Sequence, residues 1–173
     1  MLPKQAISHR QMLSEGLGKN EIKAMSASLK IFPTPFKGIY YLPSQTERKG
    51  WFIEKPLMVL SRSIELFLGN RDFYYSCASA EEFWGIRWRP SGKIHIINEK
   101  ASLRIDLNER IERNKRKNTY RAKKIAAILS FYGEEIIFHK TASVKECMVK
   151  QTPSGRFASK FQVKKDRKKF RCR

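Results

Sequence analysis

The sequence lacks the features that mark exported and membrane-spanning proteins. Its 173 residues contain no run of about 18 apolar side chains, so we expect no helix that crosses a bilayer. The first residues, MLPKQAISHRQ, hold no apolar segment of the kind that a secretory signal carries. These absences predict a cytoplasmic protein with no membrane partner.

Cysteine is scarce, and its spacing excludes two common uses. The three cysteines, Cys77, Cys147 and Cys172, are odd in number and far apart. They form neither a disulfide framework nor the C-x-x-C spacing of a zinc site. We therefore predict reduced thiols, with Cys77 in a strand, and neither a metal nor a cofactor.

Common catalytic motifs are also missing. The sequence has no H-E-x-x-H, no G-x-S-x-G and no Walker-type glycine loop. Its three histidines lie at no metal-ligand spacing: His9, His95 and His139. A magnesium-dependent nuclease would need carboxylates, and the available ones are Asp72, Asp106, Glu109, Glu134 and Glu135. Because no lysine completes an E-x-K motif after Glu134-Glu135, we predict that the protein is not an enzyme and keep a nuclease as an alternative.

Acidic residues are few relative to basic ones. The chain has 16 aspartates and glutamates against 36 lysines and arginines, which gives a formal net charge of +20. Self-repulsion at this charge opposes compaction, so an anionic partner is expected. Apolar residues make up 41% and aromatic residues 12%, enough for a folded core. A basic protein with a core is typical of nucleic-acid binding, and the nucleoid would be its place in the cell.

The most apolar and least charged stretch is Phe73–Ile97. The aromatic run Phe73-Tyr74-Tyr75 favours a strand. The S-x-x-E pattern of Ser79–Glu82 predicts the start of a helix, which Gly85 would end. Pro90, Ser91 and Gly92 then turn the chain into a second strand, Lys93–Ile97. We expect the basic remainder of the protein to be arranged around this stretch.

The N-terminal residues have the order of a helix-turn-helix with a wing. Helices are predicted over Ala6–Glu15 and Asn20–Phe32, separated by the glycine turn at Gly16–Gly18. An extended piece, Lys37–Pro43, follows. The second helix would present lysine and serine to a DNA major groove. The candidate DNA-reading residues are Lys19, Lys23, Ser26 and Lys30 in the helix and Lys37 in the wing.

Beyond this segment the periodicity predicts several further elements. Ser44–Gly50 reads as a polar linker, and Trp51–Gly69 as a helix with Pro56 in its first turn. The other expected elements are a strand at Ser102–Leu107 that pairs with Lys93–Ile97, a helix at Thr119–Tyr132, a strand at Glu134–Lys140 and an edge strand at Arg156–Val163.

Two basic segments are candidate phosphate contacts, which supply affinity but no choice of sequence. The first comprises Arg110, Arg113, Lys115, Arg116, Lys117, Arg121, Lys123 and Lys124. The second belongs to an expected tail that does not fold alone, and comprises Lys164, Lys165, Arg167, Lys168, Lys169, Arg171 and Arg173.

Two motifs resemble the AbiEi-type antitoxin regulators of type IV toxin–antitoxin systems. Gly38–Pro43, GIYYLP, is similar to the G-x-Y-x-x-P end of the wing in that family. Tyr74–Gly85, YYSCASAEEFWG, is similar to its Y-x-S-x-x-S-A-x-x-x-x-G core, with the helix Pro56–Leu68 between them. The resemblance covers roughly Met12–Lys100. It implies a winged-helix DNA reader joined to an α/β domain, a repressor of its own operon, and a nucleotidyltransferase-like toxin as partner.

Together these observations predict an α+β protein. We expect a helix-turn-helix or winged-helix-like segment at residues 1–43, a mixed α/β domain with a small sheet at 51–163, and a basic tail at 164–173. The expected function is DNA binding and transcriptional regulation. An RNA-binding or ribosome-associated protein, a metal-dependent nuclease and a protein that only coats nucleic acid remain alternatives.

Overall fold

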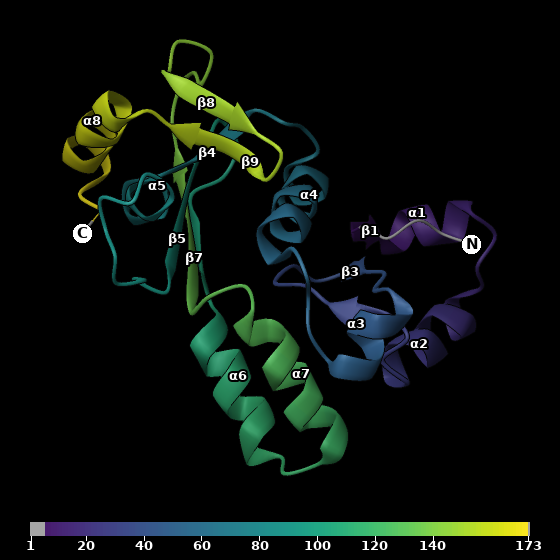
Figure 1. The fold of residues 1–173 in the computed structure, drawn as a ribbon. Helices are drawn as coiled ribbons and strands as arrows, with labels where there is room; N and C mark the ends of the chain where they lie inside the picture. Colours follow the sequence, from purple (N-terminus) through teal and green to yellow (C-terminus); the bar gives the residue numbers. More distant parts are fainter. Residues whose placement is uncertain (1–5, 173) are drawn as a thin grey trace. The chain divides into compact units, whose positions relative to one another are not determined.

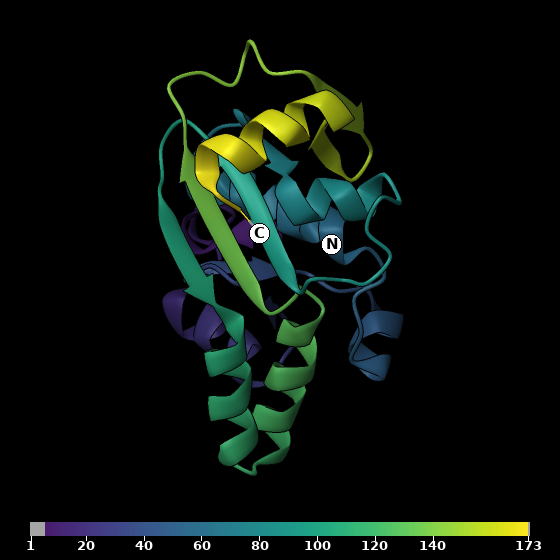
Figure 2. The same ribbon diagram turned by 90° about the vertical axis from the view of Figure 1, so that its left-hand side faces the viewer.

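The structure is a computed structural model that describes residues 6–172 (Figures 1 and 2). In this range it is a mixed α/β fold with eight helices, one sheet of three strands and one of six. The chain forms two compact units that alternate along the sequence. The first unit comprises Met1–Gly69 and Leu107–Tyr132, and the second comprises Asn70–Asp106 and Gly133–Arg173. This division differs from the predicted boundaries because two helices in the middle of the chain belong with the N-terminal part.

The first unit begins with a small antiparallel sheet and two helices. In chain order the elements are β1 (Ala6–Ser8), α1 (His9–Ser14), α2 (Lys19–Ala27), β2 (Phe32–Pro33) and β3 (Ile39–Tyr41). The strand order is β1-β3-β2. Two predicted helices are therefore shorter than expected. The first begins at His9 because Ser8 and Gln11 form a capping box, and the second ends at Ala27 because Leu29 takes a left-handed backbone conformation.

The predicted linker at Ser44–Gly50 is wrong, because Gln45–Gly50 forms a helix, α3. Ser44 caps this helix, and its partner in the capping box is Glu47. The buried Glu47 carboxylate also accepts hydrogen bonds from the Tyr41 hydroxyl at 2.9 Å and from the Glu54 backbone N–H at 2.9 Å. One carboxylate thus ties α3 to β3 and to the chain that follows.

The predicted helix at Trp51–Gly69 is shorter than expected, because α4 spans Pro56–Leu68. Pro56 stands in its first turn as predicted, and Gly69 ends it in the left-handed conformation.

Two antiparallel helices complete the first unit, α6 (Leu107–Arg116) and α7 (Tyr120–Ser130), seen as the green hairpin in Figure 1. Helix α7 begins close to the predicted place, because the Thr119 side chain accepts a hydrogen bond from the Ala122 N–H. The Arg110 guanidinium donates to the carbonyl of Pro35, and Tyr120 packs edge-on against Trp51. These contacts hold both helices of the hairpin on the N-terminal part of the unit.

The second unit is a mixed six-stranded sheet with two helices on one face (Figures 1 and 2). The strand order is β6-β7-β5-β4-β9-β8, with β5–β7 and β4–β9 parallel and the other pairs antiparallel. In chain order its elements are β4 (Phe73–Ser76), α5 (Cys77–Phe83), β5 (Lys93–Asn98), β6 (Leu103–Asp106), β7 (Glu135–Lys140), β8 (Val149–Thr152), β9 (Gly155–Ala158) and α8 (Lys160–Phe170).

The strand–helix–strand order predicted for Phe73–Ile97 is confirmed, and β4 and β5 pair directly. The helix starts earlier than expected, at Cys77, and Ser79 is not its cap. Phe83 stacks on Phe157 with ring centroids 4.1 Å apart, and the Trp84 indole N–H donates to the Ala158 carbonyl at 2.8 Å. These contacts fix α5 against the sheet.

Three expectations about the second unit are wrong. Strand β6 pairs with β7 and not with β5, because the parallel strand β7 occupies that edge of β5. Strand β9 is an inner strand, and it ends at Ala158. The expected basic tail forms most of α8, whose buried face carries Gln162, Val163 and Asp166. Between Ala6 and Cys172, no helix has both the length and the apolar character needed to cross a bilayer.

Candidate nucleic-acid interface

A basic groove of about 500 Å³ lies on the first unit, over α2 and the start of α7. It contains three of the predicted contact residues in α2 and one in α7. We call this hollow the basic groove. The residues that line it are His9, Lys19, Ile22, Lys23, Ser26, Ala27, Tyr40 and Arg121.

The exposed face of α2 supplies the lysines of the groove. Ile22 is 2% exposed and packs in a cluster with Met12 and Ile31, so it fixes which way the helix faces. Lys19 and Lys23, one turn apart, are exposed on the other side. The two lysines therefore stand side by side at one wall of the groove.

Arg121 comes from α7 but is held against α2. Its Nε donates to the Ala27 carbonyl at 2.9 Å, and its Nη2 donates to the Ser26 carbonyl at 3.2 Å. The carbonyls at the C-terminal end of a helix carry a partial negative charge, which suits a guanidinium. The side chain remains exposed, so its charge is presented to a ligand while its position is fixed. Arg121 was predicted to belong to a separate basic segment, because this contact joins parts of the chain about a hundred residues apart.

The other two residues predicted for the DNA-reading segment lie outside the groove lining. Lys30 follows α2, and Lys37 lies in the turn between β2 and β3; both are exposed. His9 and Tyr40, which sequence reasoning did not select, line the groove instead. Only their positions in α1 and β3 bring them there, and no sequence pattern signals it.

The α6–α7 hairpin displays most of the first predicted basic segment. The side chains that are exposed are Arg113, Lys115, Arg116, Lys117, Arg121 and Lys123. Arg110 is half-buried against Pro35, and Lys124 lies over the rings of Trp51 and Tyr120 at 4.9 and 5.0 Å from their centroids. Arg110 and Lys124 thus have structural contacts that the sequence did not reveal.

The second basic segment lies mostly on the solvent side of α8. Lys164, Lys165 and Lys168 are exposed, and Lys165 lies over the Phe161 ring at 4.7 Å. The other described members of the segment, Arg167, Lys169 and Arg171, are also exposed, and Arg173 lies outside the described residues. Arg167 pairs with the buried Glu81 of α5 at 2.7 Å. Arg167 therefore stabilises the contact between α5 and α8 and is also exposed to a partner.

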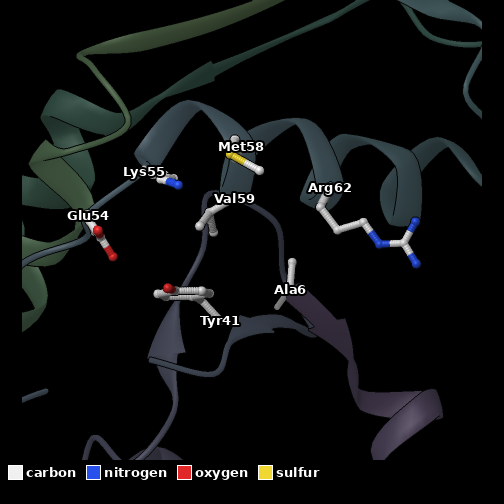
Figure 3. Close-up of a pocket in the computed structure, with 7 residues that line it drawn as sticks. All are labelled: Ala6, Tyr41, Glu54, Lys55, Met58, Val59 and Arg62. Atoms are coloured by element: carbon white, nitrogen blue, oxygen red, sulfur yellow. The ribbon is translucent and has the colours of Figure 1, made fainter. Parts of the chain in front are cut away.

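A second hollow, of about 410 Å³, lies beneath α4 in the first unit (Figure 3). Met58 and Val59 of the helix face Ala6 and Tyr41 of the sheet, while charged side chains stand at its two ends. Burial, together with the Glu47 carboxylate, raises the pKa of the Tyr41 hydroxyl, which therefore stays protonated. This lining is largely apolar and does not suit a polyanion.

The buried polar groups of the second unit gather beneath α8. The Asp166 carboxylate, 2% exposed, accepts hydrogen bonds from Ser76 Oγ at 2.6 Å, Tyr74 Oη at 3.1 Å and Gln162 Nε2 at 2.8 Å. Burial, a contact with Cys147 and the Asp166 charge raise the pKa of the Tyr74 hydroxyl, so it remains a donor. Because three donors satisfy the carboxylate, it anchors α8 to β4.

Next to this anchor, two histidine rings stack with centroids 5.3 Å apart, and His95 Nδ1 lies 3.0 Å from His139 Nε2. Burial lowers the pKa of His95 to about 4, and the neighbouring His139, Lys93 and Arg87 add to the shift. Burial also lowers the pKa of His139. Both rings are therefore neutral at neutral pH.

The acids considered for a nuclease are not gathered into a metal site in the described part of the chain. Among residues 6–172, the group of three or more metal-ligating side chains close enough to share an ion is Cys77, His95 and Cys172. Glu135 instead forms an ion pair with Arg104 across the β6–β7 pair.

Comparisons with models of protein families, with curated proteins and with solved structures found no match to this chain.

Proposed function

We propose that the protein binds nucleic acid, with duplex DNA favoured over RNA, and acts as a transcriptional regulator. The observation that carries this proposal is the basic groove. Lys19, Lys23 and Arg121 present three cations around one hollow, and one of them is fixed by two hydrogen bonds. A cation that is held in place binds phosphates more strongly than a flexible one, because it loses less side-chain entropy on binding.

The order of elements around the groove supports a helix-turn-helix interpretation. Helices α1 and α2 are joined by a glycine turn and are followed by the β2–β3 hairpin. In DNA-binding proteins of this kind the second helix enters the major groove, and its first residues reach the base edges. Here that helix is α2, which exposes Lys19 and Lys23 near its start, and Lys37 would rest on the backbone as part of a wing.

The exposed cations outside the groove would extend the contact to further phosphates. Those on α6 and α7 belong to the same unit as the groove. Phosphate contacts position the protein and supply affinity without reading bases. We therefore propose that α2 chooses the sequence while its lysines also contact phosphates, and that the other basic side chains add further salt-dependent affinity.

The decisive measurement is binding of the full chain to labelled duplex DNA and to structured RNA at matched salt. A selection from random duplexes would then give the preferred sequence. Lys23→Ala with Ser26→Ala is expected to relax that preference, whereas Lys164→Gln with Lys168→Gln is expected to weaken all duplexes alike and reduce the salt dependence. Equal behaviour of the two double variants would refute the division of roles. A preference for structured RNA would refute the DNA assignment.

A second candidate is binding of single-stranded RNA through the second unit. Trp88 is 88% exposed with the Arg89 guanidinium 5.9 Å from its ring centroid, and Phe161 is 56% exposed beneath Lys165. Exposed rings with adjacent cations suit stacking on unpaired bases. Trp88→Ala should weaken RNA binding severalfold and leave duplex DNA binding unchanged if both activities exist.

We further propose that binding occurs without catalysis and that a nucleotidyltransferase-like toxin is a partner, as the resemblance to AbiEi-type regulators implies. Incubation with plasmid and magnesium or manganese should leave the DNA intact. Cutting that Asp106→Ala abolishes would refute the non-catalytic assignment. For the toxin, the test is whether the neighbouring gene encodes a nucleotidyltransferase-like protein whose toxicity this chain suppresses on co-expression.

A further inference from the structure

Three potential metal ligands from distant parts of the sequence meet inside the second unit. They are Cys77 at the start of α5, His95 in β5 and Cys172 just after α8. Their ligand atoms all lie within 4.8 Å of one another, and the residues are 1%, 2% and 7% exposed. The two sulfurs also form a disulfide, with Cα atoms 6.1 Å apart. The prediction of a reduced Cys77 in a strand is therefore wrong for this structure.

The His95 ring provides a second and independent sign of a ligand. Its Nδ1 faces His139, and this leaves Nε2 as the nitrogen available to another group. Nε2 is buried and has no hydrogen-bond partner among residues 6–172. A buried polar atom without a partner is costly and uncommon in a folded protein. A bound cation at Nε2 would remove this cost.

We propose that Cys77, Cys172 and His95 bind one zinc ion when the two cysteines are reduced, and that the same sulfurs form the disulfide when they are oxidised. Two thiolates and one imidazole are a soft donor set, which favours zinc over magnesium or calcium. No local motif signals this group, because the cysteines are 95 residues apart and the histidine lies between them.

The geometry of the three residues is compatible with both states. Zinc–sulfur bonds of about 2.3 Å and zinc–nitrogen bonds of about 2.0 Å place two sulfurs and one nitrogen about 3.5–3.8 Å from each other in a tetrahedral site. That separation is within the 4.8 Å that encloses the three ligand atoms. A Cα separation of 6.1 Å also falls in the range for a disulfide. Moving between the states thus requires a shift of the sulfurs and little of the backbone.

His139 completes the surroundings in the way that zinc-bound histidines require. A histidine that binds metal through Nε2 carries its proton on Nδ1 and donates it to a neighbour. His139 Nε2, at 3.0 Å, is placed to accept that proton, and its ring packs against Phe170 of α8 at 5.0 Å between centroids. With Nδ1 engaged by His139, Nε2 is the ligand atom that His95 would offer to the ion.

The exchange between the two states balances with ordinary thiol chemistry. A dithiol reductant gives two electrons and two protons to the disulfide and becomes a disulfide itself. Zinc then displaces the protons of both thiols and binds the thiolates. In the reverse direction hydrogen peroxide takes two electrons from the two thiolates and, with two protons, becomes two waters, while the disulfide forms and the zinc ion is released. Both states tie the start of α5 to the end of α8.

The test uses the full chain, reduced with a phosphine and kept anaerobic, and titrated with Co²⁺ as a spectroscopic probe and then with Zn²⁺. We expect one cobalt ion per chain, a thiolate-to-cobalt charge-transfer band, and loss of that band when zinc displaces the cobalt. The oxidised chain should bind neither ion at the same concentrations. Cys172→Ser and Cys77→Ser should weaken cobalt binding at least tenfold.

Cys147→Ser is the matched control, because Cys147 is the remaining cysteine and is not a member of the group. It should bind cobalt as the unmodified chain does. His95→Gln should weaken binding and lower the intensity of the cobalt spectrum. The proposal is overturned if the reduced unmodified chain shows no stoichiometric thiolate band, or if Cys147→Ser loses as much affinity as Cys172→Ser. The comparison of reduced and oxidised unmodified chain decides the question even if a variant does not fold.

Discussion

The salt dependence of DNA binding is the sharpest measure of the basic groove. Lys19 and Lys23 lie side by side on the exposed face of α2. If each neutralises one phosphate, Lys19→Ala with Lys23→Ala should reduce the slope of log K against log salt by about 1.8, since each contact contributes about 0.9. Extrapolated from about 1 M to about 0.15 M salt, two such contacts correspond to roughly 30-fold in affinity.

The measurement is fluorescence anisotropy of a labelled duplex over a series of salt concentrations. Its control is Lys49→Ala with Lys145→Ala, which also removes two exposed positive charges, but outside the groove and outside both basic segments. We expect this control to change the affinity by less than about threefold, because charges distant from the DNA are screened. If the two double variants weaken binding equally, the affinity comes from net charge alone and the groove has no special role.

One further prediction concerns the stability of each unit, and a third concerns the C-terminal helix. Glu47→Gln should lower the free energy of unfolding by about 1–3 kcal/mol, because the carboxylate accepts buried hydrogen bonds, whereas the exposed Glu112→Gln should cost less than about 0.5 kcal/mol. Burial raises the pKa of Glu47, but hydrogen bonds from two backbone N–H groups and Tyr41 outweigh it and hold the pKa below the ordinary value of a glutamate. This contribution is therefore complete above the ordinary pKa of a glutamate and is lost as the pH falls through the lower folded-state pKa. The free energies of unfolding of the unmodified protein and of Glu47→Gln, measured in urea, should converge in acid. Phe157→Ala should cost about 3–5 kcal/mol, because this buried ring stacks between two others; a smaller loss would contradict the packing. Deleting residues 164–173 should abolish cooperative unfolding of the second unit, because the deletion removes Asp166 and its buried hydrogen bonds. A truncated chain that keeps its near-UV circular dichroism would show that α8 is dispensable.

Local patterns in the sequence were sufficient for elements with their own start and stop signals. The β4–α5–β5 order, the helix after Pro56 and the helix capped by Thr119 were predicted from such signals, although the start signal at Ser79 is not the cap of α5. The helix α3 was missed although Ser44 and Glu47 have the S-x-x-E spacing of a capping box, because the segment is short and polar. The helix α8 was not predicted because its many lysines are typical of a solvated tail, although Val163 and Asp166 form a buried face.

Features that depend on long-range contacts could not be predicted. The parallel pairing of β5 with β7 requires the chain to return after the whole α6–α7 hairpin, and nothing in either strand specifies that partner. The groove residue Arg121 and the meeting of Cys77 with Cys172 depend on the same kind of closure. Sequence periodicity reports which face of an element is buried, but not which distant element covers it.

The alternation of the two units along the chain has a consequence for synthesis on the ribosome. Neither unit can complete its fold when only its first segment has left the ribosome. The first unit also needs Leu107–Tyr132, and the second also needs Gly133–Arg173. Strands β4 and β5 leave the exit tunnel well before β7 and β9, the neighbours that cover their edges. Unpaired strand edges of this kind invite association between nascent chains. We expect the protein to depend on chaperones more than its modest length suggests. Expression of the first segment of either unit alone should yield insoluble material.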